Sequence, residues 1–198
     1  MNSRVYPTYK TKYRVANWAS YDRALVGRGD VTLWMSPEAI AAPYDRDHFV
    51  RVDASIALSL IRLPAHASMT VSFDLYILKS WDGDSPTFGP DRWNVGLAGS
   101  PALLDTTFSN NFKTDTDRSV QSYPSPASAP QTGAAAVNTL GYGFWFGDAT
   151  YHFTFTFSHT MESAIVTFSS SLYEGKAEQA RSTRDESWGL DNVGVTVR

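Results

Sequence analysis

From residue 50 onward, apolar and polar side chains alternate along the chain with a period of two. Between residues 52 and 60 the apolar positions are Val52, Ala54, Ile56, Leu58 and Leu60. Successive side chains of a β-strand point to opposite faces, so this spacing predicts a strand with one buried face. The alternation recurs at residues 70–77, 93–97, 153–158, 164–169 and 190–197. Such strands, joined by turn-rich loops, predict an all-β domain, a jelly-roll-like antiparallel β-sandwich.

The composition narrows the classes of function that the chain can serve. It has no cysteine, which excludes disulfides and thiolate metal sites. Its formal net charge of −3 gives no general attraction to nucleic acid, and no apolar run is long enough to span a membrane. We therefore expect neither a nucleic-acid nor a membrane partner. The first residues contain no apolar segment of the signal-peptide kind, so as written the chain is expected in the cytoplasm.

Residues 1–44 differ from residues 45–198 in charge and in predicted secondary structure. They carry six Lys or Arg and three acidic residues, and their pattern predicts two short helices, at 17–26 and 36–42, around a strand at 30–34. We expect a short α/β leader at 1–44 and the sandwich at 45–198.

The leader resembles the N-terminal segment of DDE-type insertion-sequence transposases, through residues 12–34 and 37–40 within the span 12–42. In that family the segment precedes a ribonuclease-H-like catalytic core. Nothing after residue 44 looks like that core, so none of its metal-binding acids has a matching position. The net charge of +3 on residues 1–44 is too small to indicate DNA binding. We expect an inert fused leader, or one that supplies a packing strand.

Residues 46–198 resemble an exported, planctomycete-type β-sandwich domain. The matching segments are 63–66, 71–77, 80–83, 89–93, 106–110, 139–142 and 186–193. The resemblance implies a relative of calcium-stabilised carbohydrate-binding jelly rolls, in which an Asp near the start of the last strand often binds calcium. Asp191 occupies that place. Members usually carry a further N-terminal strand, so the sandwich lacks one edge strand here unless residues 31–34 replace it.

Two predicted strands each begin with an acid in phase with apolar residues. Asp191 alternates with three valines, and Asp91 with Trp93 and Val95. A carboxylate that faces a core needs a cation or several donors. Further acids lie in the Gly-rich loop at 82–84 and before the last strand. Calcium prefers carboxylate and carbonyl oxygens, and no histidine adjoins these acids, so zinc is less favoured. The predicted ligands are Asp82, Asp84, Asp91, Glu186 and Asp191; arginines or backbone amides are the alternative partners.

Three tryptophans flank these acids in the sequence. As a surface near the ion they could stack on sugar faces; core packing is the alternative role. The predicted ligand-binding residues are Trp81, Trp93 and Trp188. The four histidines are expected to be solvated or hydrogen-bonded: His48, His66, His152 and His159.

The sequence therefore favours a non-catalytic, calcium-stabilised binding module with a glycan as its ligand. Neither Gly-x-Ser-x-Gly nor His-Glu-x-x-His occurs. A metal-dependent hydrolase, using the same acids with a histidine, is the alternative function. A fusion product with no selected activity is the third interpretation. Unpaired sheet edges would permit a homodimer.

Overall fold

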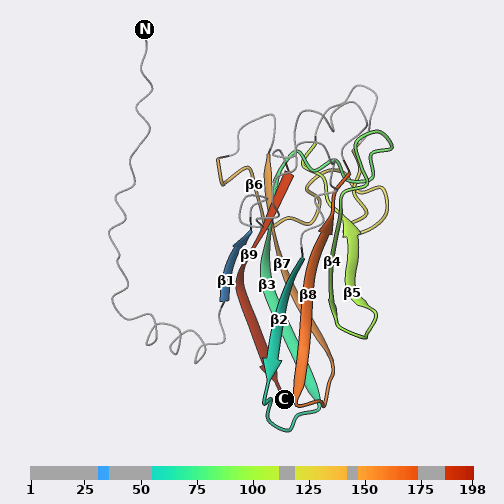
Figure 1. Ribbon diagram of the computed structural model, residues 1–198. Helices are drawn as coiled ribbons and strands as arrows, with labels where there is room; N and C mark the ends of the chain where they lie inside the picture. Colours follow the sequence, from blue (N-terminus) through green and yellow to red (C-terminus); the bar gives the residue numbers. More distant parts are fainter. Residues whose placement is uncertain (1–30, 36–54, 112–118, 142–146, 174–185) are drawn as a thin grey trace, which may run out of the picture.

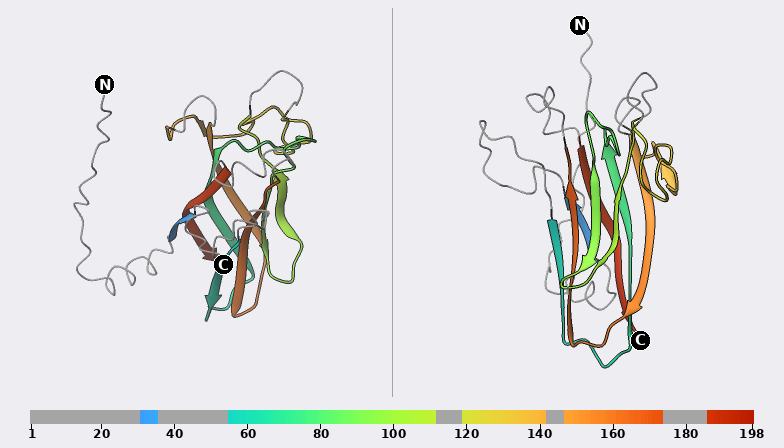
Figure 2. Two further views of the ribbon diagram at one scale, coloured as in Figure 1. Left: turned by 45° about the horizontal axis from the view of Figure 1, so that its top comes forward. Right: turned by 90° about the vertical axis from the view of Figure 1, so that its right-hand side faces the viewer.

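A computed structural model of the chain describes residues 31–35, 55–111, 119–141, 147–173 and 186–198. They form two antiparallel sheets packed face to face (Figures 1 and 2). The strands are β1 (Val31–Met35), β2 (Ser55–Ile61), β3 (Ser68–Lys79), β4 (Arg92–Leu97), β5 (Ala102–Thr107), β6 (Ala136–Val137), β7 (Asp148–Ser158), β8 (Ser163–Ser171) and β9 (Glu186–Val197). The helices expected at 17–26 and 36–42 lie outside the described residues, as do His48 and residues 142–146.

The predicted β-sandwich is confirmed. One sheet has the order β1-β9-β3-β7-β6 and the other β2-β8-β4-β5, and every pair is antiparallel. The connections β2–β3, β3–β4, β7–β8 and β8–β9 each pass from one sheet to the other, as in jelly rolls. The described residues contain no helix, and hence none that is long and apolar enough to cross a membrane.

The core lies between the two sheets and follows the alternation of the sequence. β3 is the central strand of its sheet, and its inward residues Met69, Val71 and Leu75 are fully buried. Aromatic rings fill the middle of the sandwich: Phe73 of β3 makes an edge contact with Phe168 of β8 at 5.2 Å between centroids. Large apolar side chains from both sheets thus hold the layers together.

The leader contributes one strand to the sandwich. β1 forms an edge of the five-stranded sheet and pairs with β9, with Val31 opposite Val193 and Met35 opposite Trp188. Of the two alternatives left open for the leader, an inert segment or one that supplies a packing strand, the observed pairing is the second.

A β-bulge divides the last strand into two halves of opposite phase. Ser72 of β3 pairs with Gly194, but Asp74 pairs with Asp191, so Asn192 and Val193 together face one residue of β3. Asn192 adopts a left-handed conformation with φ of 52°. A bulge of this kind turns the following residues to the other face.

The expectation that Asp191 points inward with the valines is therefore wrong. Beyond the bulge, Leu190 and Trp188 are the buried residues, while Asp191 lies beside Asp74 on the outer face of the sheet. Its Oδ1 accepts a hydrogen bond from the backbone N–H of Asn192 at 2.7 Å.

Candidate metal centre

Three acids from separate parts of the chain meet at one end of the sandwich. Asp82 lies in the loop after β3, Asp91 immediately precedes β4, and Glu186 is the first residue of β9. One carboxylate oxygen of each lies within 4.8 Å of the other two. We refer to Asp82, Asp91 and Glu186 as the acidic triad. It is the only such group of His, Asp or Glu side chains in the part of the chain that the structure describes.

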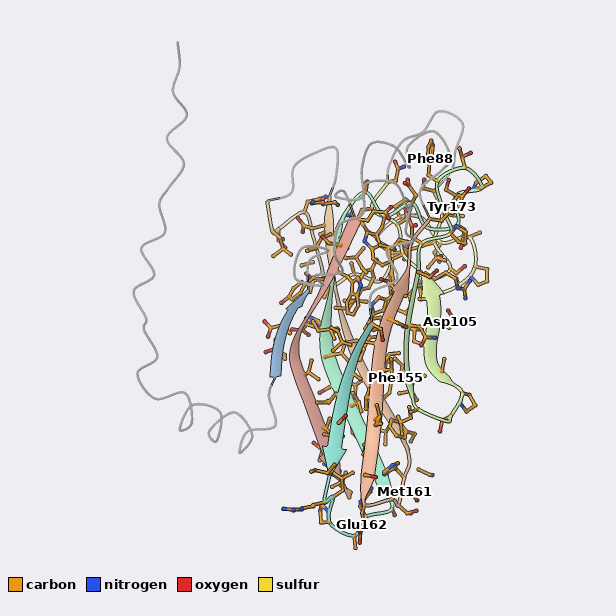
Figure 3. All side chains as sticks on the ribbon, viewed as in Figure 1. Phe88, Asp105, Phe155, Met161, Glu162 and Tyr173 are labelled. Carbon is orange, nitrogen blue, oxygen red and sulfur yellow. The ribbon has the colours of Figure 1, made fainter. Side chains whose placement is uncertain are left out.

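The triad lies at the end of the sandwich to which Phe88 and Tyr173 belong, because the backbone of Tyr173 contacts Asp91 (Figure 3). Met161 and Glu162 mark the opposite end. All three acids are buried: Asp91 is fully inaccessible, Glu186 is 5% exposed and Asp82 is 8% exposed. Three carboxylates so close together, and so far removed from water, cannot all be ionised at low cost unless positive charge or protons balance them.

A tight loop places two of these acids beside each other. After β3, Asp82 forms an isolated bridge with Ser109, and the chain then turns at Gly83, whose φ is +60°. The backbone N–H of Asp91 donates to the carbonyl of Gly83 at 2.8 Å, which closes the loop on itself. A Cβ at position 83 would lie 2.2 Å from the carbonyl oxygen of Val120, so the loop requires glycine there.

Asp91 is held by backbone donors on both carboxylate oxygens. Oδ2 accepts the N–H of Asp82, and Oδ1 accepts the N–H of Tyr173 at 3.2 Å. Burial and, to a smaller extent, the negative charge of Asp82 together raise the pKa of Asp91 to about 8, against the opposing effect of the hydrogen bonds from Asp82, Tyr173 and Glu186. The site therefore strongly disfavours the charged form of Asp91 as long as no cation is bound.

Neutral donors surround Asp82. Its Oδ1 accepts from the side-chain amide of Asn111, and the hydroxyl of Ser119 lies 3.5 Å away. Asn111 is itself fixed by the hydroxyl of Ser109, which accepts its N–H at 3.1 Å. Asn111 and Ser119 are not recognisable from the sequence, because they lie in a polar stretch without periodicity. Their amide and hydroxyl groups are of the oxygen-bearing type that accompanies carboxylates in calcium sites.

Asp84, another predicted ligand, lies outside the triad. Its Oδ1 accepts the hydroxyl of Thr107 at 2.8 Å, and its Oδ2 accepts the hydroxyl of Ser122 at 2.7 Å. These bonds tie the loop to β5 and to the segment after residue 119. The structure thus brings together three of the five predicted ligands; Asp84 and Asp191 face other partners.

The three tryptophans are buried, so the expected exposed stacking surface is not formed by them. Each lies within two residues of a triad acid: Trp81 beside Asp82, Trp93 after Asp91 and Trp188 after Glu186. Trp93 and Trp188 each lie two positions from an acid, so the alternation of β4 and β9 turns both kinds of side chain inward, and apolar contact with the core outweighs exposure of the rings.

The tryptophans are anchored in the core near the segments that carry the triad. The indole N–H of Trp81 donates to the carbonyl of Ser187 at 3.0 Å, and that of Trp188 donates to the hydroxyl of Ser170 at 2.8 Å. The rings of Trp93 and Trp188 meet edge to face at 5.9 Å. These contacts fix the starts of β4 and β9, and hence the positions of two of the three acids.

The described histidines lie elsewhere. His152 contacts Asp74 on the outer face of the five-stranded sheet, where the side-chain amide of Asn192 also donates to Asp74. His66 and His159 contact each other in the turns before β3 and after β7. An all-oxygen donor set therefore fits a hard cation such as calcium better than zinc, which prefers nitrogen or sulfur ligands.

No family model matches the sequence, and no solved structure matches the fold.

Proposed function

We propose that the chain is a cation-stabilised β-sandwich binding module, in which the acidic triad holds a calcium ion. The observation that carries the proposal is the convergence of three buried carboxylates, within 4.8 Å of one another, from three separate segments. A divalent ion would neutralise their mutual repulsion and would join the loop after β3, the start of β4 and the start of β9. Asp82, Asp91 and Glu186 would bind it, with Asn111 and Ser119 beside them.

A structural ion is favoured over a catalytic one. A catalytic metal keeps a coordination position open to water and substrate. The triad is more than nine-tenths buried, and the described histidines lie on other surfaces. The arrangement therefore supports a closed site that stabilises a fold rather than an ion that activates water.

We propose a glycan as the ligand of the module, recognised by aromatic side chains near the ion. Since the three tryptophans are buried, other rings must supply the stacking surface. Phe88 and Tyr173 are half-buried and lie at the triad end of the sandwich (Figure 3). The backbone N–H of Phe88 donates to the hydroxyl of Ser85 at 2.9 Å, which fixes that turn. An aromatic face held in this way suits the apolar face of a sugar ring.

Ion binding is tested by calorimetric titration of calcium into the chelator-treated full chain. The account expects one ion per chain for the wild type and a loss of binding for Asp82→Asn. Asp84→Asn is the matched control, because that residue lies two positions away and bonds hydroxyls outside the triad. Equal calcium binding by all three proteins, or no calcium binding by the wild type, would refute the proposal.

Glycan binding is tested separately, by screening the calcium-loaded chain on a glycan array. Retention should weaken for Phe88→Ala and Tyr173→Ala but not for Phe155→Ala, whose ring contacts Phe73 and Phe153 in the core region. No retention of any glycan by a calcium-binding, folded chain would refute the ligand and leave the ion site standing.

A further inference from the structure

Two histidines meet at the end of the sandwich opposite the acidic triad. His66 lies in the turn between β2 and β3, and His159 in the turn between β7 and β8. The same end carries Met161 and Glu162 in Figure 3. The two turns are joined by backbone hydrogen bonds, from Leu63 to Glu162 at 2.9 Å and from His159 to Ala67 at 3.2 Å. The histidines are 93 positions apart in the sequence, so only the fold brings them together.

The two imidazole rings point their nitrogens at each other. Nε2 of His66 lies 2.7 Å from Nδ1 of His159, and the ring planes differ by 15°. This separation is shorter than the roughly 3.5 Å contact of a face-to-face stack. The rings therefore lie nearly edge to edge, and the lone-pair direction of one nitrogen is aimed at the other.

The second nitrogen of His66 determines its tautomer. Nδ1 lies 2.5 Å from the carbonyl oxygen of Pro64, which can only accept a hydrogen bond. Nδ1 therefore carries the proton, and Nε2 carries the lone pair. An imidazole oriented by a backbone carbonyl in this way is the usual form of a metal-ligating histidine.

In the neutral pair, a single proton lies between the two rings. Nδ1 of His159 donates it to Nε2 of His66. In the other tautomer of His159, reached by proton exchange with solvent, the outer Nε2 carries the hydrogen and Nδ1 also presents a lone pair. Two lone pairs then converge on one point from two separate turns.

We propose that His66 Nε2 and His159 Nδ1 form a two-histidine site for a divalent transition-metal ion such as zinc, nickel or copper. Two imidazole nitrogens on one tetrahedral ion lie about 3.3 Å apart. From 2.7 Å, the pair would have to open by about 0.6 Å, and the rings would have to turn so that both lone pairs point at the ion rather than at each other. Both rings are half-buried, so water can complete the coordination. Imidazole selects these ions over calcium and magnesium.

The site is separate from the acidic triad in place and in chemistry. β3 runs its full twelve residues between the two ends, a span of roughly 40 Å. A metal ion here would cross-link two turns that each connect one sheet with the other. It would therefore stabilise the end of the sandwich that carries Met161 and Glu162, whereas an ion at the acidic triad would stabilise the opposite end.

The direct test is nuclear magnetic resonance of the histidine ring nitrogens in the full, tag-free chain. Zinc is added in the presence of excess calcium, which occupies carboxylate sites. The proposal expects the signals of His66 Nε2 and His159 Nδ1 to shift together, at one zinc per chain, while those of His152 stay unchanged. Ring signals of both residues that ignore zinc would overturn the proposal. This readout does not depend on whether the triad binds calcium.

Variants give an independent measurement by calorimetric titration of zinc. His66→Gln and His159→Gln should each weaken binding about tenfold or more. His152→Gln is the matched control and should bind zinc like the wild type, since its partner is Asp74. Equal zinc affinity of the wild type, His66→Gln and His159→Gln would refute the site.

Discussion

Asp82 and Asp91 are nine positions apart and are joined by a backbone-to-carboxylate hydrogen bond, from the N–H of Asp82 to Oδ2 of Asp91. One carboxylate oxygen of each of these residues lies within 4.8 Å of the other and of an oxygen of Glu186. Apolar packing of the neighbouring tryptophans holds the three segments together despite this repulsion. The fold therefore gathers three carboxyl groups whose ionised form a cation would stabilise.

The first prediction concerns pH. In the folded, metal-free chain the pKa of Asp91 is raised from 3.8 to about 8, chiefly by burial. Below pH 4 the group is protonated in both states and its contribution to stability is fully present. As pH rises toward 8 the unfolded chain releases the proton more readily, so stability falls, by up to about 1.4 kcal/mol per pH unit.

Urea denaturation at pH 5 and pH 8, with chelator, measures this effect. The wild type should lose more stability between the two values than Asp91→Asn, which cannot titrate. Added calcium should remove the difference, because the ion stabilises the ionised form. An identical pH dependence in both proteins would contradict the raised pKa.

Gly83 gives the second prediction. Gly83→Ala would place a Cβ 2.2 Å from the carbonyl oxygen of Val120 at a left-handed φ of +60°. Gly99 is the matched control, since its φ is +79° but no atom lies within 4 Å of a Cβ there. Gly99→Ala should cost about 1–2 kcal/mol for the conformation alone. Gly83→Ala should cost a further ~1–3 kcal/mol for the clash, measured by urea denaturation, and equal costs would contradict the loop geometry.

The third prediction compares two buried tryptophans. The N–H of Trp188 donates to the hydroxyl of Ser170 and so links the two sheets, whereas the N–H of Trp93 has no acceptor among the described residues. Replacement by phenylalanine removes a similar volume at each position. Trp188→Phe should therefore be the more destabilising, by about 1–2 kcal/mol. Chemical denaturation monitors this, and the reverse order would show that the hydrogen bond does not contribute as described.

The fourth prediction concerns Asp191, for which the sequence pattern and the structure indicate different roles. Asp191 was predicted as a calcium ligand from a sequence resemblance, but it lies on the outer face beside Asp74. Asp191→Ala should leave the calcium titration of the chain unchanged and alter stability by less than about 1 kcal/mol. A loss of calcium binding in this variant would place the ion on the outer face.

The strands were predictable because each has one apolar and one polar face. The alternation in β3 and in β7 gave both the strand and its buried side, and Asp91 was placed inward by the same reasoning. The bulge in β9 was not predictable from alternation, because an inserted residue leaves the pattern intact on either side and only shifts its phase. Asn192, with its tolerance of positive φ, and the nearby Gly194 are the local signals that indicate such a break.

The candidate site was only partly predictable, for a related reason. Its acids were recognisable by phase and loop position, but pairing between distant segments decides which of them meet. Asn111 and Ser119 reach Asp82 from a stretch without periodicity, and His66 meets His159 through the contact of two turns. The three tryptophans were predicted to form an exposed surface, but they are buried. Their position beside an acid in the sequence does not indicate whether the ring is exposed or lies in the core.

The most direct test of the account is a thermal melt of the full, chelator-treated chain with and without calcium, for the wild type, Asp91→Asn and Asp105→Asn. Asp105 is a matched control, because it is exposed and pairs with Arg92 at 2.7 Å. Calcium at a hundredfold excess over its dissociation constant should raise the midpoint of the wild type and of Asp105→Asn by roughly 5–10 °C. It should leave Asp91→Asn unmoved. No shift in the wild type, or an equal shift in Asp91→Asn, would contradict a calcium site at the acidic triad.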